Sequence, residues 1–395
     1  MDYFPADREA KRQVLLQAVR DVAEVVAAGG PEAEKNTTLP MSAVLAMQEA
    51  GLFRLKMAAE LGGADADPVT QMEVIEALTA VYPSAGWVLM TNATAIGNAS
   101  AFLPDDAIAE VFEGGQVPRA ATVGGVSSTI EPVPGGFILN GRWPFCSGVP
   151  HSEWICLGAR LYREPGASPD VYTCFVRTKD VTIHDNWHVA GLRGSGSNDV
   201  SADNLFVPES FTWPRYDRAR GIRRRGGPIF LLGLPGSVSN EHASFALGVG
   251  RLALDLVKEI AMTKRRGRGP AAVTLANRQV FQRFVGEAEL RLRSARMVTF
   301  EVHERAWEIA CEGVMPDPAL EAEMRASAVY CTEVAADIAT QAFRFGGGEA
   351  LHDENRLQMC MRDINAGAQH LAVSDVAYEN LGQFYLDLPE ANPYY

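Results

Sequence analysis

The hydrophobic period of the chain changes twice, and the order of these changes limits the folds that it can adopt. Up to about residue 115, apolar residues recur at the spacing of amphipathic helices. Helices are predicted over residues 7–28, 42–50, 68–81, 87–102 and 105–112. The first part of the chain is therefore expected to be almost entirely helical.

The period then becomes that of short strands. Runs rich in β-branched and aromatic residues, bounded by glycine, proline and asparagine, cover residues 120–126, 129–132, 136–140, 154–160, 171–177, 181–189 and 200–207. No helical stretch separates these runs, which predicts an antiparallel β unit and argues against βαβ crossovers.

The helical period returns near Ser237 and continues almost to the end of the chain. Long amphipathic segments cover residues 239–266, 277–313, 318–345 and 356–382. Four long helices with short connections predict an up-down bundle. We therefore expect an α+β fold, mostly α, with a helical domain at 1–117, a β domain at 118–225 and a four-helix bundle with a C-terminal tail at 226–395.

Composition and charge exclude several classes of function. The net charge of −13 argues against nucleic acid or an anionic membrane as the main partner. No apolar run is long enough for a membrane span, and the charged N-terminus does not resemble a signal peptide. The six cysteines are scattered without a CxxC pair, which favours free thiols in a reducing cytoplasm. The seven histidines show no metal-site spacing, and neither a Walker loop nor a Rossmann GxGxxG turn is present.

An unusual polar stripe lies in the last predicted helix. Asp363, Gly367, His370 and Ser374 are spaced so that they share one face of a continuous helix. A glycine between an acid and an imidazole would leave room for a flat group against the helix. The alternative is a packing glycine between two ordinary polar residues.

Two further segments could bind a flat, anionic molecule. Residues 141–154 (GRWPFCSGVPHSEW) combine aromatic rings for stacking with hydroxyls for edge hydrogen bonds, although the rings could equally fill the core of a sheet. Residues 191–199 (GLRGSGSND) could bind an anion through backbone N–H groups, or could form a plain turn between strands.

Two arginine-rich segments stand out in this acidic protein. Residues 215–225 (RYDRARGIRRR) could form a lid over an anionic or planar ligand, or a solvated loop. Residues 263–270 (TKRRGRGP) follow a long helix, where arginines can compensate the helix dipole or grip a phosphate.

These features, in this order, resemble the acyl-CoA dehydrogenase superfamily over nearly the whole chain. The helical N-terminal domain, the β domain with GRWPFCSG, the GLRGSGSNDV…VP segment and the C-terminal bundle carry the resemblance. It implies an acyl-CoA dehydrogenase-like fold with a flavin between the β domain and the bundle. It also implies a homotetramer, or a dimer, in which a neighbouring subunit completes the flavin site.

The last helix is similar to one branch of that superfamily. Dehydrogenases carry a glutamate base soon after an Arg-Asp pair, whereas here Arg362 and Asp363 are followed by INAGAQHLAV. Arg-Asp with a histidine seven residues after the aspartate resembles the flavin-dependent monooxygenases called group D. This resemblance implies C4a-hydroperoxyflavin chemistry with O2, reduced FAD or FMN from a separate NAD(P)H-flavin reductase, and hydroxylation of an aromatic or heteroaromatic small molecule.

The resemblance also implies roles for particular residues. His370 and Ser147 would line the reactive face of the flavin, and Asn92 would join them in catalysis. One departure concerns the helix at 87–102, where several members of the branch carry a histidine or another base and this chain offers only Asn92, Thr94 and Asn98. The substrate pocket is expected at Trp87, His242, Phe245 and Gly367. The cofactor-binding residues are expected to be Trp143, Phe145, Cys146, Ser147, Ser195, Ser197, Arg265, Arg266, Gly346, Gly347 and Asp363, with the two arginines holding the flavin phosphates of a neighbouring subunit.

Three other functions compete with this interpretation. A dehydrogenase or flavin oxidase could use a relocated base, for which Glu379 is the nearest downstream carboxylate. An amine N-hydroxylase would share the flavin chemistry and differ in its pocket lining. A catalytically silent member of the fold would bind no flavin.

Overall fold

The computed structural model describes residues 3–164, 166–267, 269 and 272–393. The N-terminal region is helical, as predicted, and contains α1 (Arg8–Ala28), α2 (Gly30–Asn36), α3 (Met41–Glu49), α4 (Pro68–Val81), α5 (Pro83–Phe102) and α6 (Asp105–Val111). Helix α5 begins before the predicted residue 87 because Pro83 occupies its first turn, where a missing N–H costs nothing. The side chain of Asp67 caps α4 by accepting a hydrogen bond from the amide of Thr70.

The middle region forms an eight-stranded sheet among the described residues, in the order β6-β7-β3-β2-β4-β5-β8 with β1 beside β4. The strands are β1 (Ala120–Thr122), β2 (Thr129–Val133), β3 (Gly136–Trp143), β4 (Trp154–Leu161), β5 (Asp170–Arg177), β6 (Thr182–Ile183), β7 (Val200–Pro208) and β8 (Thr212–Pro214). The pairing is mainly antiparallel, as predicted. However, β1 and a single residue pair of β2 run parallel to β4, because the β2–β3 hairpin and the turn after it bring the chain back in the same direction.

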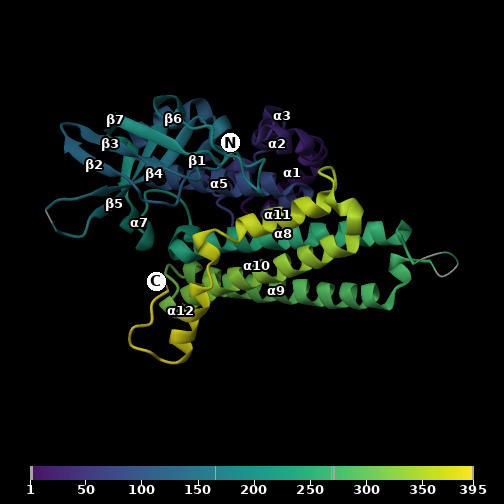
Figure 1. The fold of residues 1–395 in the computed structure, drawn as a ribbon. Coiled ribbons are helices and arrows are strands. Elements are labelled where there is room, and N and C mark those ends of the chain that lie inside the picture. Colours follow the sequence, from purple (N-terminus) through teal and green to yellow (C-terminus); the bar gives the residue numbers. More distant parts are fainter. Residues whose placement is uncertain (1–2, 165, 268, 270–271, 394–395) are drawn as a thin grey trace.

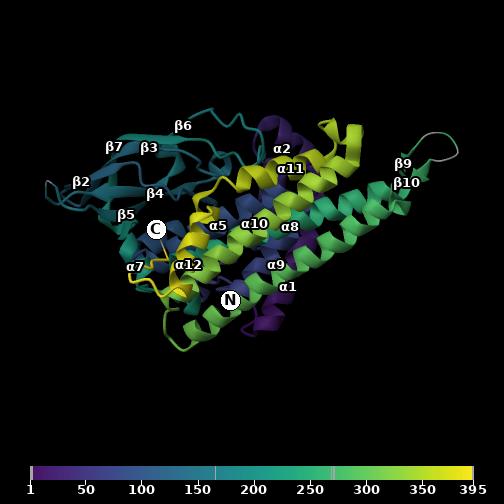
Figure 2. The same ribbon diagram turned by 60° about the horizontal axis from the view of Figure 1, so that its bottom comes forward.

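The C-terminal region is a helical bundle built on α8 (Gly233–Thr263), α9 (Gln279–Cys311) and α10 (Pro318–Gly346). Helix α8 lies against both α4 and α10, so it joins the N-terminal helices to the bundle (Figures 1 and 2). The predicted domain boundaries fall in the connections before β1 and after α7 (Arg215–Ala219).

The prediction of one helix over 356–382 is wrong. Helix α11 (Arg356–Gly367) ends at the glycine, a short 3-10 turn covers Leu371–Val373, and α12 (Val376–Tyr385) starts anew. The ring of His370 caps the 3-10 turn, with Nδ1 accepting from the amide of Ala372 at 3.1 Å. The break separates His370 and Ser374 from the helical face of Asp363, and it leaves Glu379 exposed on a different helix.

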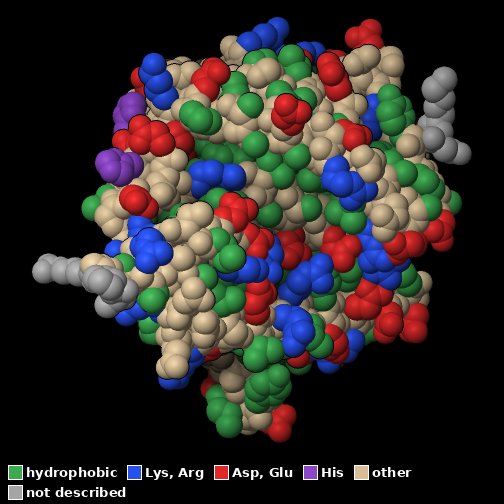
Figure 3. Space-filling model, turned by 90° about the vertical axis from the view of Figure 1, so that its right-hand side faces the viewer, with side chains coloured by type: hydrophobic (Ala, Val, Ile, Leu, Met, Phe, Trp, Pro, Cys, Tyr) green, Lys and Arg blue, Asp and Glu red, His purple; other side chains and the backbone are tan. Residues whose placement is uncertain are grey.

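The surface carries both signs of charge. Acidic and basic side chains are interspersed on the face at the far end of the bundle, shown in Figure 3. Within the described part of the chain, no helix combines the length and apolarity that a bilayer crossing needs. The same residues contain no group of three or more His, Cys, Asp or Glu side chains that could hold a metal ion.

Candidate active site

Four aromatic rings meet where α5, α8 and the end of α11 come together, and we call Trp87, His242, Phe245 and His370 the ring cluster. Trp87 is its centre, with its ring centroid 5.3 Å from that of His242, 5.0 Å from Phe245 and 6.1 Å from His370, all edge to face. The imidazoles of His242 and His370 stack at 4.2 Å. The structure thus brings together three predicted pocket residues and the predicted catalytic histidine.

A chain of hydroxyl groups leads from the ring cluster into the β domain. The indole N–H of Trp87 donates to Ser147 Oγ at 3.0 Å, Ser147 Oγ lies 2.7 Å from Ser197 Oγ, and Ser197 Oγ lies 2.7 Å from Ser195 Oγ. We call Ser147, Ser197 and Ser195 the serine relay. Ser195 Oγ also donates to the carbonyl of Leu192 at 2.7 Å, and all three serines are buried.

The direction of the relay follows from its last bond. Because Ser195 gives its only hydroxyl proton to a carbonyl, Ser197 must donate to Ser195, and Ser147 must donate to Ser197. Ser147 therefore receives one hydrogen bond from Trp87 and has its own proton engaged. What remains on Ser147 Oγ is acceptor capacity, so the relay prepares Ser147 to receive an N–H from a bound molecule.

The loop that carries Ser147 has an unusual backbone. Phe145 adopts the left-handed conformation with φ 64°, which is uncommon for a bulky residue. Phe145 is 66% exposed. Its ring centroid lies 6.2 Å from that of Trp187, and the two rings are arranged edge to face. Backbone bonds from Cys146 N to Asn198 O and from Gly148 N to Ser195 O hold this loop against the 191–199 loop. A strained loop that presents an exposed ring beside a prepared hydroxyl is typical of a ligand site.

Both histidines of the ring cluster are neutral near pH 7. Surrounding protein lowers the pKa of His370 to about 4 by desolvation, although the residue is open to solvent on one side, as expected in a cleft. Burial, with smaller contributions from His370 and Lys56, lowers the pKa of His242 well below its usual value. Since His370 Nδ1 accepts the amide of Ala372, the proton of the neutral ring is on Nε2 and can be donated.

One backbone N–H of the 191–199 loop is occupied by the chain's own Asp363 carboxyl group. Leu192 N donates to Asp363 Oδ1 at 2.7 Å, and Gly191 lies so close to α11 that a Cβ there would be 2.2 Å from the carbonyl oxygen of Arg362. Burial, and then the charge of Glu34, raises the pKa of Asp363 to about 7. Asp363 therefore positions the loop that carries Ser195 and Ser197.

Three predicted site residues have other surroundings. Trp143 is fully buried and its Nε1 donates to the carbonyl of Gly158 at 2.7 Å, so it belongs to the core of the sheet and not to a cofactor surface. The thiol of Cys146 is likewise buried in that core. Gly367 does leave room for a flat group, but Phe245 occupies that room, since a Cβ there would lie 2.6 Å from Phe245 Cε1.

Asn92 lies apart from the ring cluster. It follows Trp87 by five residues on α5, which places it about 140° around the helix from Trp87. The side chain is buried, and its Oδ1 has no hydrogen-bond partner within the described residues.

The predicted phosphate-binding residues lie at the other end of the bundle. Arg265 and Arg266 form the short strand β9 (Arg265–Arg266), which Figure 2 shows far from the β domain. Arg266 donates to the carbonyl of Phe345 at 3.3 Å and packs against Gly347, which follows Gly346. Arg266 and Gly347 therefore meet at the end of the bundle that carries β9, remote from the ring cluster of their own chain.

A buried charged cluster near the ring cluster was not predicted. Lys56 and Glu241 form an ion pair of 2.6 Å that also involves Thr94, and Arg218 lies beside it. The signal that could have revealed it is the spacing of Trp87, Thr91, Thr94 and Asn98, which places a polar stripe along one face of α5.

Comparison with known proteins agrees with this architecture. Residues 9–103 match the family "Acyl-CoA dehydrogenase, N-terminal domain", and residues 241–375 match "Acyl-CoA dehydrogenase, C-terminal domain". The chain belongs to the acyl-CoA dehydrogenase superfamily. Together the two matches span most of the helical part of the molecule, including the ring cluster.

Several proteins similar to it are named as monooxygenases. The indole-3-acetate monooxygenase of Pseudomonas putida is 29% identical over 94% of this chain and 92% of that protein. The oxygenase subunit HsaA, a flavin-dependent monooxygenase of Rhodococcus jostii (strain RHA1), is 28% identical over 86% of this chain and 90% of that protein. The structure of XiaF from Streptomyces sp., in complex with FADH2 and glycerol, aligns with a TM-score of 0.87 at 27% identity over 95% of this chain and 96% of XiaF.

Proposed function

We propose that this chain is the oxygenase component of a two-component flavin-dependent monooxygenase. It would take reduced flavin, FADH2 first, from a separate NAD(P)H-flavin reductase and hydroxylate an aromatic or heteroaromatic small molecule with O2. The observation that carries this proposal is the pairing of a neutral His370 with an acceptor Ser147 around Trp87. The relatives support it, since one acts on an indole and another is named an oxygenase subunit.

The residues present fit a reduced flavin. The exposed ring of Phe145 offers a stacking surface next to Ser147. A reduced flavin carries a ring N–H that the oxidised form lacks, so the spare acceptor capacity of Ser147 matches the reduced form. Ser147 and Phe145 are therefore the side chains we assign to the flavin ring, with Ser197 and Ser195 as positioning residues.

The chemistry divides between the cofactor and the chain. Bound reduced flavin supplies the two electrons with which O2 is split, so that one oxygen atom enters the substrate and the other leaves as water. His370 can donate a hydrogen bond from Nε2 to a bound molecule, because its Nδ1 already accepts the amide of Ala372 and the proton of the neutral ring lies on Nε2. Trp87, Phe245 and His242 surround it with buried rings and exclude water from that side.

The flavin phosphates require a second subunit in this proposal. Arg265, Arg266, Gly346 and Gly347 are remote from the ring cluster of their own chain, so they would act on the site of a neighbour in a homotetramer or dimer. The cytoplasm is the expected compartment, because all six cysteines are free thiols.

The test is oxygen transfer by the His370→Ala variant with enzymatically reduced FAD and a panel of indoles, phenols and amines. Without the imidazole, we expect the hydroxylated product to fall about 100-fold while O2 consumption continues as hydrogen peroxide release. The measurement is product formed per O2 consumed. His188→Ala, which removes an exposed imidazole outside the ring cluster, should keep the wild-type ratio.

Two results would contradict the proposal. The first is no oxygenated product from any member of the panel with the wild-type chain and reduced flavin. The second is an unchanged ratio of product to O2 in His370→Ala. Product from the amines alone would instead identify an N-hydroxylase.

A further inference from the structure

His242 is a buried polar side chain without a hydrogen-bond partner in the part of the chain that the structure describes. The residue is only 4% exposed, and burial is the main cause that lowers the pKa of its ring. A neutral imidazole carries one N–H donor and one acceptor nitrogen, whichever tautomer it adopts. Both groups are therefore unused in a place where an unpaired polar group costs free energy.

The rings that surround His242 do not supply the missing partner. The imidazole of His370 stacks on it at a centroid distance of 4.2 Å and an interplanar angle of 30°. Stacked rings do not hydrogen-bond each other, because their N–H bonds lie in the ring planes. The indole N–H of Trp87 is donated to Ser147, and Phe245 has no hydrogen-bonding group. A partner for His242 must therefore come from outside the ring cluster.

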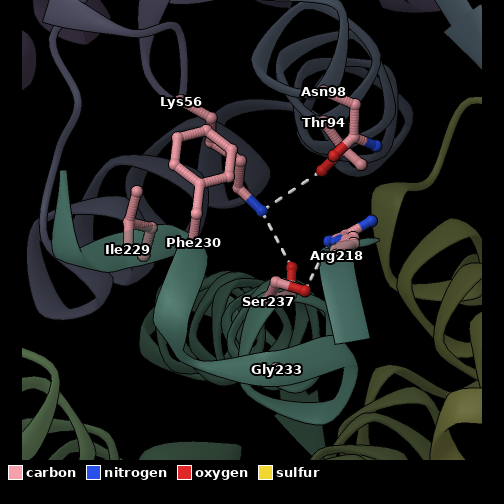
Figure 4. A pocket seen from close by; sticks show the side chains of 8 residues that line it. All are labelled: Lys56, Thr94, Asn98, Arg218, Ile229, Phe230, Gly233 and Ser237. Carbon is pink, nitrogen blue, oxygen red and sulfur yellow. Dashed lines mark hydrogen bonds between the residues drawn. The ribbon is translucent and has the colours of Figure 1, made fainter. Parts of the chain in front are cut away.

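The charged groups next to His242 are engaged elsewhere. Glu241, the preceding residue, pairs with Lys56 at 2.6 Å and accepts the hydroxyl of Thr94 at 2.5 Å. Figure 4 shows that Lys56 also reaches Thr94 and the carbonyl of Ser237, at 3.2 and 3.0 Å. These three acceptors use all three donors of the ammonium group. The lysine therefore acts on His242 through its charge and not through a hydrogen bond.

A histidine in the core of the bundle shows what a purely structural imidazole looks like. Nδ1 of His303 lies 2.8 Å from the carbonyl of Thr299, and Nε2 is closed off from solvent without a partner among the described residues. Neither ring nitrogen of His242 is closed off in this way. Because the nitrogens of His242 are also unbonded, they border accessible space, as the nitrogens of a ligand-binding side chain do.

A molecule bound at the edge of His370 would also reach His242. His370 is exposed on one side, and its Nδ1 is occupied by the amide of Ala372, so it offers a donor and no acceptor. Since the two imidazoles are in stacking contact, one aromatic ring placed against their edges meets both of them. Within the ring cluster, His242 alone offers an acceptor nitrogen to that ring.

We infer that His242 accepts a hydrogen bond from an O–H or N–H group on the substrate ring and thereby selects substrates that carry one. This inference rests on the proposed function and adds to it a specificity-determining residue and the orientation of the substrate. The heteroatom that carries the proton points to His242. The other two polar groups of the site, Ser147 and the N–H of His370, remain available to the flavin.

Pairs of similar flat molecules that differ in one hydrogen-bond donor test this assignment. The probes are indole against benzofuran, and 4-methylphenol against 4-fluorotoluene. Dissociation constants are measured anaerobically by isothermal titration calorimetry with the full-length chain, alone and with reduced FAD. We expect indole or 4-methylphenol to bind about tenfold more tightly than its isostere, the effect of one hydrogen bond.

Substitutions then locate the acceptor. His242→Phe keeps a flat ring without nitrogen, so it should abolish the preference and leave the dissociation constant of the isostere within about twofold. His242→Gln keeps an acceptor and should retain part of the preference. His370→Phe should retain all of it, because the acceptor nitrogen of His370 is not available to a ligand. His352→Phe, which replaces an exposed imidazole before α11, should behave as wild type.

Binding of the isostere also reports folding, since a variant that binds it with wild-type affinity retains the pocket. If His242→Phe does not fold, His242→Leu provides the same comparison. The inference is overturned if no probe binds more tightly than its isostere. It is also overturned if the variants without a nitrogen at position 242 keep the preference.

Failure of this inference is distinguishable from failure of the proposed function, because binding is measured without turnover. A chain that binds and oxygenates both members of a pair equally well keeps the proposed function and loses the acceptor role of His242. A chain that prefers indole through His242 but forms no oxygenated product with reduced flavin keeps the acceptor role and loses the proposed function.

Discussion

The hydrogen-bond direction at Ser147 is set by residues that do not touch the ring cluster. Ser195 donates its proton to a backbone carbonyl. Ser197 must then donate to Ser195, and Ser147 must donate to Ser197. A serine hydroxyl usually rotates to suit its partner, so the relay converts an adaptable group into a fixed acceptor. This polarity would favour the reduced flavin ring, which carries an N–H that the oxidised ring lacks.

Ser197→Ala tests that polarity. Without Ser197, the Ser147 proton loses the acceptor that it has among the described residues, and the hydroxyl is free to donate to the ring nitrogen of oxidised flavin. We expect the ratio of dissociation constants, oxidised over reduced, to fall about tenfold, which corresponds to one hydrogen bond of about 1.4 kcal/mol. The measurement is anaerobic titration with reduced FAD and fluorescence titration with oxidised FAD.

The control for this experiment is Ser294→Ala, which removes an exposed hydroxyl bonded within α9. It should leave both dissociation constants at their wild-type values. An unchanged ratio in Ser197→Ala would show that the relay does not set the polarity of Ser147.

At the scale of single residues, sequence analysis identified the segment that carries the site but not which of its side chains face the site. It selected Trp143, Phe145, Cys146 and Ser147 together, because a run of aromatic and hydroxyl residues does not show which side chains point inward. The left-handed backbone at Phe145 decides this, turning its ring to solvent while Trp143 and Cys146 remain in the core. That conformation depends on bonds to the 191–199 loop, remote in sequence, so no local pattern encodes it.

At the scale of elements, hydrophobic periodicity located helices and strands but did not show where a helix is broken. Helix α4 has the predicted bounds, while the helix predicted over 356–382 is broken after Gly367. The apolar period continues through the break because the 3-10 turn keeps Val373 buried. A single glycine is tolerated inside many helices, so the sequence alone could not place the break.

Gly367→Ala tests whether the rings of Phe245 and Trp87 pack closely against the end of α11. The added Cβ would lie 2.6 Å from Phe245 Cε1 and 3.3 Å from Trp87 Cζ3, so these rings must move. We expect the free energy of unfolding to drop by about 1 to 3 kcal/mol from overpacking. Urea denaturation, followed by tryptophan fluorescence, measures the change.

The matched control is Gly286→Ala, on the exposed face of α9 where an added Cβ meets nothing within 4 Å. It should raise the free energy of unfolding by about 0.5 to 1 kcal/mol, since alanine is the better helix former. If Gly367→Ala proved as stabilising as Gly286→Ala, close packing of the rings against α11 would be refuted.

At the scale of the whole molecule, the chain divides its proposed flavin contacts between two remote places. Ser147 and His370 both lie beside Trp87, whereas β9, which carries Arg265 and Arg266, lies at the far end of the bundle (Figure 2). Helix α8 separates the two places, because the part of it from His242 to Thr263 spans about 32 Å. If both sets bind one flavin, they must come from different subunits.

Subunit complementation tests this arrangement. We expect His370→Ala and Arg265→Gln chains each to have little activity alone. When the two are unfolded together and refolded as a mixture, half of the pairs combine one chain of each kind. One of the two sites in such a pair then has an intact His370 and, from its neighbour, an intact Arg265. The mixture should therefore recover about a quarter of wild-type product formation. If Arg265 acted within its own chain, every site in the mixture would keep one defect. Product formation would then stay at the mean of the two variants, and the shared flavin site would be excluded.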